Sequence, residues 1–178
     1  MLRLGILVSG CGSNMEAIIA NCANNTIDAE VVVVISDKVN AEALQKARAQ
    51  GIPTFHSSIE EKWVDCLQKK EVDLVCLAGF MSIIKEPLLQ SFSGKIINIH
   101  PSLLPKFLGL NTHQRVLEEG ETESGCTVHY VDEGIDTGEI IMQSRVPVYE
   151  GDTEKILAKR VLKEEHRIYS EAIQKISK

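Results

Sequence analysis

The sequence has few cysteines, and they follow no pattern that would build a disulfide framework or a zinc site. Its five cysteines are odd in number and scattered, and no two have the C-x-x-C spacing. Small secreted scaffolds and structural zinc sites depend on such patterns, so both classes are disfavoured. We therefore expect reduced thiols and a cytoplasmic location.

Excess positive charge and long apolar runs are also lacking. The chain has 19 Lys and Arg against 25 Asp and Glu, for a formal net charge of −6, which argues against a basic face for nucleic acid. No apolar run approaches the roughly 20 residues of a membrane span, and Leu2–Val8 is too short for a signal-peptide core. With 44% hydrophobic and 25% charged residues, the 178 residues are typical of one globular domain. We expect neither a nucleic-acid nor a membrane partner, and an anionic substrate would need a local site of backbone amides.

Short apolar runs alternate with amphipathic segments through the first half of the chain. The runs that indicate buried strands are Leu4–Val8, Val31–Ile35, Val72–Ala78 and Ile96–Ile99, with a short extended piece at Pro53–His56. The segments with helical spacing are Asn14–Ala23, Ala41–Gln50 and Ile59–Lys69. This rhythm predicts an α/β fold with a doubly wound, mostly parallel, Rossmann-like sheet.

The second half changes character. A short helix at His113–Glu118 precedes two strand-like segments, Cys126–Val131 and Glu139–Arg145, which we expect to add an antiparallel pair to the sheet. A last helix is predicted from Thr153 to about Ile176, capped by Asp152. No repeat or linker interrupts the chain, so residues 1–178 are predicted to form a single domain.

A glycine turn, Ser9-Gly10-Cys11-Gly12-Ser13-Asn14, joins the first strand to the first helix. Glycines allow close approach of a ligand, and the amides of a helix N-terminus attract anions. The third glycine of a dinucleotide fingerprint is missing, because the chain has Met15 there. Asp37, after the second strand, could still hold a ribose, so a nicotinamide cofactor stays open. The alternative without a ligand is a capping box, in which Ser13 caps the helix and Glu16 reaches back.

The stretch Asn98-Ile99-His100-Pro101 is the most informative in the sequence. Asn98 and His100 are two residues apart on an extended segment, so both side chains point to one face. Open α/β sheets bind their ligands at the C-terminal ends of such strands. A satisfied pair of buried polar residues is the plainer alternative.

An acidic turn, Asp132–Gly138, lies between the two antiparallel segments. It lacks the EF-hand spacing for calcium, and Asp132 and Glu133 on their own indicate a solvated turn. Asp136, close to a strand start, could orient His100 and raise its pKa. Ser102 is the nearest candidate nucleophile, but no G-x-S-x-G elbow surrounds it. An amide, a histidine and an acid point to oxyanion stabilisation and proton transfer rather than to an acyl-enzyme.

Taken together, these motifs resemble the folate-dependent phosphoribosylglycinamide formyltransferase family. The resemblance runs from Leu4 to about Tyr169, and the motifs that carry it occur in the family's order. They are Ser9-Gly10-x-Gly12-Ser13-Asn14, Leu77-Ala78-Gly79-Phe80-Met81, Asn98-Ile99-His100-Pro101-Ser102-Leu103-Leu104-Pro105, Val128-His129 and Asp136-x-Gly138. The Asn-His-Pro-Ser-Leu-Leu-Pro block is shared with methionyl-tRNA formyltransferase and formyltetrahydrofolate deformylase.

The resemblance implies a reaction and a set of site residues. The formyl group of 10-formyltetrahydrofolate would pass to the glycyl amine of glycinamide ribonucleotide in purine biosynthesis, without a metal, in a monomer or homodimer. Asn98, His100 and Asp136 match the catalytic trio, and residues 98–178 would form the catalytic and folate half. Residues 1–100 would form the nucleotide-phosphate half. The implied ribonucleotide contacts are Gly12, Ser13 and Asn14 at the phosphate and Glu165 at the ribose. The implied walls of the pterin pocket are Met81, Ser82, Ile83 and Ile84 on one side and Asp132, Glu133, Gly134 and Ile135 on the other.

Three alternatives stay open at this point. Water could replace the amine, which would make the protein a formyl hydrolase. The glycine turn alone could belong to a non-catalytic nucleotide-binding module. A dinucleotide-dependent reductase is the third, and Met15 disfavours it.

Overall fold

The computed structural model describes all 178 residues and contains one seven-stranded sheet in the order β3-β2-β1-β4-β5-β6-β7. Neighbouring strands from β3 to β5 pair in parallel, and the β5–β6 and β6–β7 pairs are antiparallel. The predicted α/β sheet with an antiparallel addition is therefore confirmed. The strands are β1 (Leu2–Val8), β2 (Ala29–Ser36), β3 (Thr54–His56), β4 (Leu74–Leu77), β5 (Ile96–His100), β6 (Glu123–Tyr130) and β7 (Ile140–Pro147).

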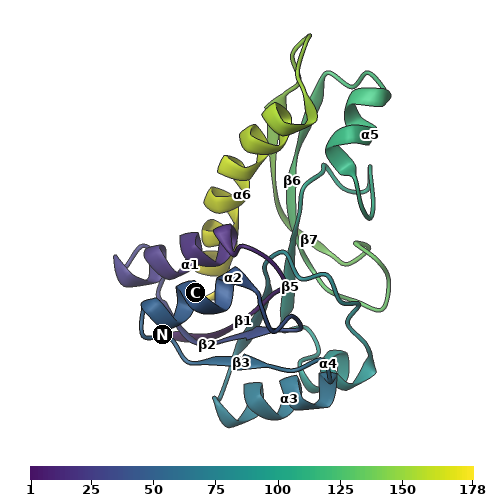
Figure 1. The fold of residues 1–178 in the computed structure, drawn as a ribbon. Helices are drawn as coiled ribbons and strands as arrows, with labels where there is room; N and C mark the ends of the chain where they lie inside the picture. Colours follow the sequence, from purple (N-terminus) through teal and green to yellow (C-terminus); the bar gives the residue numbers. More distant parts are fainter.

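Helices cover both faces of the sheet (Figure 1). The helices are α1 (Ser13–Ala23), α2 (Glu42–Ala49), α3 (Glu60–Lys69), α4 (Glu86–Ser91), α5 (Thr112–Glu118) and α6 (Glu154–Ile176). Side chains of β1 alternate between two cores: Leu4 and Ile6 pack with α1, α2 and α6, whereas Leu7 packs with α3 and α4. Because both faces are buried, the parallel strands have the continuous apolar runs seen in the sequence.

The long helix α6 links the parallel and antiparallel parts of the sheet. It runs from the tip of β6 and β7 to the side of α1, as Figure 1 shows. Tyr169 of α6 is fully buried, and its hydroxyl donates to the carbonyl oxygens of Leu77 (2.8 Å) and Ile97 (3.2 Å). This contact anchors α6 on β4 and β5. No helix of the protein combines the length and apolar character needed to cross a membrane.

One helix was not predicted, and one predicted helix cap was wrong. Helix α4 was not expected, since its six residues are too few for a clear helical period. The cap of α6 is Thr153 rather than Asp152, because the Thr153 hydroxyl accepts from the amide of Ile156 at 3.2 Å. Asp152 instead pairs with Arg160 at 2.6 Å.

Candidate active site

The glycine turn leaves the N-terminus of α1 without a side-chain cap. Gly12 is the N-cap residue, with φ 80° and ψ 30°, and Ser13 is already inside the helix. The capping-box alternative is therefore wrong, and Glu16 instead pairs with Lys46 of α2 at 3.1 Å. A side chain on Gly12 would also approach Ala43 to 2.6 Å. Because no side chain takes the first-turn amides, the turn keeps the anion-binding capacity predicted from its sequence.

Glu165 of α6 lies beside this turn. Its side chain is 8% exposed, and burial raises its pKa to about 7, an effect that the neighbouring Asn14 only partly opposes. The Asn14 side-chain oxygen is buried without a hydrogen-bond partner. The structure thus brings Asn14 and Glu165 together, although 150 residues separate them in the chain, and leaves a polar surface next to the anion-binding turn.

The second cluster is built at the C-terminal end of β5. Asn98 and His100 share one face of the strand, as their spacing predicts, and Asp136 comes to them from the turn after β6. The His100 Nδ1 atom is 3.3 Å from one Asp136 oxygen. His100 and Asp136 are both largely buried, so the polar trio lies in a sheltered position where charges interact strongly.

His129 completes this cluster, and we did not assign it a role from the sequence. It lies directly opposite Asn98 in the antiparallel β5–β6 register. Its Nδ1–H donates to the Tyr130 carbonyl at 2.8 Å, and its Nε2 lies 3.3 Å from the Asn98 side-chain nitrogen. Nε2 is also 3.7 Å from Asp136. The Val128-His129 motif was visible in the sequence, but only the strand pairing shows that this histidine orients Asn98.

The segment after Pro105 closes over the cluster. The Phe107 carbonyl accepts a hydrogen bond from His100 Nε2 at 2.8 Å, and the Gly109 amide donates to Asp136 at 2.9 Å. Both ring nitrogens of His100 therefore face oxygen acceptors. Ser102, the candidate nucleophile, is fully buried and donates its hydroxyl to the Lys106 carbonyl at 2.6 Å. Ser102 is thus a structural residue of this segment.

The pKa of His100 differs from the expectation. Burial lowers the pKa of His100 below its usual value, and the Phe107 carbonyl and the Asp136 carboxylate only partly offset this effect. The predicted rise is wrong because burial outweighs the carboxylate. Burial also raises the pKa of Asp136, but contacts with His129, the Gly109 amide and His100 outweigh it and leave that pKa lowered. Asp136 is therefore ionised at neutral pH, beside a His100 ring whose lowered pKa favours the neutral form.

The two segments expected to enclose a pterin present exposed apolar side chains. Met81, Ile83 and Ile135 are each more than 60% exposed. Ile84 and Val131, at the roots of the two segments, both pack against the core formed with α3 and α4, which places the segments on the same side of the sheet. Such exposed apolar groups are typical of a surface that binds a ligand or a partner.

Polar residues of these segments have local partners. Asp132 accepts hydrogen bonds from the Gly134 amide (2.9 Å) and the Thr137 hydroxyl (2.8 Å), so it shapes its own turn, while Glu133 is exposed. Ser82 donates its hydroxyl to Asp37 at 2.6 Å.

A hollow of about 540 Å³ lies between α4 and the start of the acidic turn. A second one, of about 420 Å³ near Met1, lies at the opposite edge of the sheet from the chemistry.

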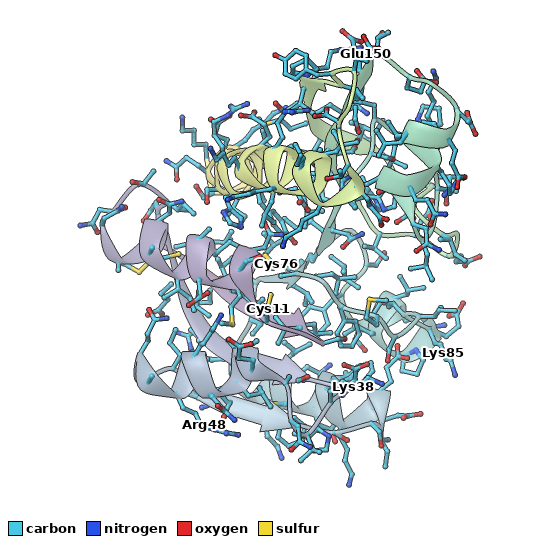
Figure 2. All side chains as sticks on the ribbon, turned by 45° about the horizontal axis from the view of Figure 1, so that its top comes forward. Cys11, Lys38, Arg48, Cys76, Lys85 and Glu150 are labelled. Atoms are coloured by element: carbon cyan, nitrogen blue, oxygen red, sulfur yellow. The ribbon has the colours of Figure 1, made fainter.

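The thiol in the glycine turn differs from the others. Cys11, labelled in Figure 2, is exposed, whereas Cys76 and Cys126 are buried. Burial raises the pKa of Cys22 to about 11 and that of Cys126 to about 12. Cys11 is therefore the accessible cysteine next to the anion-binding turn.

The chain matches one family model, described as formyl transferase, over residues 2–173. It is similar to the phosphoribosylglycinamide formyltransferase of Haemophilus influenzae, with 41% identity over 95% of this chain and 84% of that protein. The same enzyme of Escherichia coli K12 is 39% identical over 94% of this chain and 84% of its own length. The trifunctional purine biosynthetic protein adenosine-3 of Bos taurus is 43% identical, but this chain spans only 18% of its length.

Solved structures agree with these sequence matches. The glycinamide ribonucleotide transformylase 1 of Symbiobacterium toebii superposes with a TM-score of 0.95 at 46% identity, covering 98% of this chain and 86% of that one. The phosphoribosylglycinamide formyltransferase of Brucella melitensis gives a TM-score of 0.91, also at 46% identity, over 98% and 95% of the two chains. The fold thus recurs in proteins whose names state a formyl transfer.

Proposed function

The chain belongs to the formyl transferase family, and from this premise we propose that it is a phosphoribosylglycinamide formyltransferase. It transfers the formyl group of 10-formyltetrahydrofolate to the glycyl amine of glycinamide ribonucleotide, a step of purine biosynthesis. The products are formylglycinamide ribonucleotide and tetrahydrofolate.

One observation carries this assignment: the buried cluster of Asn98, His100, His129 and Asp136 and the uncapped anion-binding turn lie at the same edge of one sheet. The turn follows β1 and the cluster ends β5, with β4 between them in the sheet. A substrate with a phosphate at one end and an amine at the other can therefore reach both. Gly12, Ser13 and Asn14 hold the phosphate, and Glu165 accepts from the ribose hydroxyls.

The chemistry needs a stabilised oxyanion and a path for one proton. The amine nitrogen bonds to the formyl carbon, and the carbonyl oxygen takes up negative charge. Asn98, whose side-chain nitrogen lies 3.3 Å from His129 Nε2, offers an amide hydrogen to that oxygen. The pair of His100 and Asp136, in contact at His100 Nδ1, accepts the proton that the amine releases. The proton then passes to N10 of the folate as the bond between N10 and the formyl carbon breaks.

The folate occupies the apolar surface between the two exposed segments. Met81, Ser82, Ile83 and Ile84 form one wall and Asp132, Glu133, Gly134 and Ile135 the other. In this arrangement residues 98–178 supply the catalytic groups and the acidic turn, and residues 1–100 supply the phosphate turn and the other wall. The proposed steps require no metal.

An absorbance assay for the deformylated folate, run with and without glycinamide ribonucleotide, tests this function. We expect product to form only when the ribonucleotide is present. Formation at the same rate without ribonucleotide, with release of formate, would establish the hydrolase instead. A nucleotide-binding module would bind the ribonucleotide, show no turnover and keep its affinity in His100→Asn.

A further inference from the structure

Asp37 follows β2, at the sheet edge that carries the site, and the residue is only 9% exposed. One oxygen accepts from the Ser9 hydroxyl at 2.6 Å, and the other accepts from the Ser82 hydroxyl at 2.6 Å. No basic side chain pairs with it. Each oxygen of Asp37 therefore already has one hydrogen-bond donor within the protein.

The two hydroxyls come from the two segments that bind different substrates. Ser9 is the first residue of the phosphate turn, and its hydroxyl oxygen also accepts from the Met81 amide at 2.8 Å. Ser82 is a residue of the folate wall. The backbone adds a further link, because the Ser9 amide donates to the Gly79 carbonyl at 3.2 Å. One buried carboxylate thus ties the turn after β1 to the segment after β4.

The choice of a carboxylate has a physical reason. A buried charge without an ion pair is costly unless hydrogen bonds satisfy it, and hydroxyl bonds to a carboxylate are stronger than neutral ones. Met81 and Ile83, which flank Ser82, are exposed and have little packing of their own. The Ser82–Asp37 bond and the Ser9 hydroxyl that accepts from the Met81 amide are therefore two side-chain contacts that fix the conformation of this wall.

We propose that Asp37 is a positioning residue that holds the phosphate turn and the folate wall in register and so sets the affinity for both substrates. Ser82 acts on the folate side only, through Asp37. This inference depends on the proposed function for the identity of the two ligands. The reacting atoms lie at Asn98, His100 and Asp136, so the step after both substrates bind does not depend on Asp37.

The test is a double-mutant cycle with Asp37→Ala and Ser82→Ala. Asp37→Ala should raise KM for both the folate and the ribonucleotide about five- to twenty-fold, since hydrogen bonds to a charged group are lost. Its kcat should stay within about two-fold of wild type. Ser82→Ala should raise KM for the folate alone, and adding it to Asp37→Ala should cause no further rise. Asp65→Ala, at an exposed position of α3, is the matched control and should change neither KM.

Several results would overturn the inference. One is that Asp37→Ala leaves both KM values unchanged. Another is that Asp37→Ala lowers kcat as much as it lowers kcat/KM. The third is that the effects of the two substitutions are fully additive. The absence of a cooperative thermal transition in Asp37→Ala would show that this variant does not fold. Ser82→Ala then tests the inference by itself. A general folding defect in Ser82→Ala would change both KM values, whereas the inference requires a change in the KM for the folate alone. Turnover by the wild type tests the proposed function separately. If turnover is absent, calorimetric titration of each ligand into the same variants still tests the link.

Discussion

Replacing Glu165 with Gln should make the stability of the protein less dependent on pH. Burial raises the pKa of Glu165 from 4.5 to about 7 in the folded state. The folded protein therefore holds a proton between those pH values that the unfolded chain releases. A raised pKa stabilises the fold fully below about pH 4.5, and this contribution is lost as pH rises through about 7.

The size of the effect follows from the shift. A change of roughly 2.5 pKa units corresponds to about 3 kcal/mol at 1.36 kcal/mol per unit. At pH 8, where Glu165 is ionised, its contribution to the free energy of unfolding of the wild type is lower by this amount than at low pH, where Glu165 is protonated. Glutamine has nearly the same shape and stays neutral at every pH, so Glu165→Gln should be more stable than wild type above pH 8. The two proteins should differ little at pH 5.

The assay is urea unfolding of both proteins at pH values from 5 to 8.5. Glu150→Gln is the matched control, since Glu150 is exposed and lies far up the molecule at the top of Figure 2. The control should keep the wild-type pH dependence. Parallel curves for wild type and Glu165→Gln across this range would show that Glu165 is not held protonated by burial, and would refute the reasoning.

Three further predictions concern the catalytic cluster, the core and the turn. His100→Asn should lower kcat about 100- to 1,000-fold with little change in ribonucleotide affinity, and a variant that keeps more than about a third of kcat would contradict its role. Tyr169→Phe removes a hydroxyl that two buried carbonyls share and should cost about 1–3 kcal/mol of unfolding free energy, measured in urea. Cys11 should react fastest of the five cysteines with an alkylating reagent, and bound ribonucleotide should slow it; equal rates or no protection would place the phosphate elsewhere.

The architecture was predictable because it rests on local patterns. Buried parallel strands appear as continuous apolar runs, and the two-residue spacing of Asn98 and His100 fixes one face whatever the partner strand is. The glycine turn was also visible, but its cap was not. The capping box requires Ser13 to stand outside the helix, and the positive φ of Gly12 moves that boundary back by one residue.

Contacts between distant segments could not be predicted from the sequence. His129 meets Asn98 only because β6 pairs with β5 in one particular antiparallel register. Asp37 accepts hydrogen bonds from two serine hydroxyls, which lie in turns that the strand order brings together. The pKa of His100 depends on how deeply the ring is buried under residues 106–109, and no motif records that depth.

The central claim is that the formyl group passes directly to the ribonucleotide amine, and carbon NMR with a ¹³C-labelled formyl group on the folate tests it most directly. The wild type with glycinamide ribonucleotide should convert the label to the formamide carbon of formylglycinamide ribonucleotide, and His100→Asn should do so at least about 100-fold more slowly. Label appearing as free formate, with the ribonucleotide left unmodified, would contradict the account.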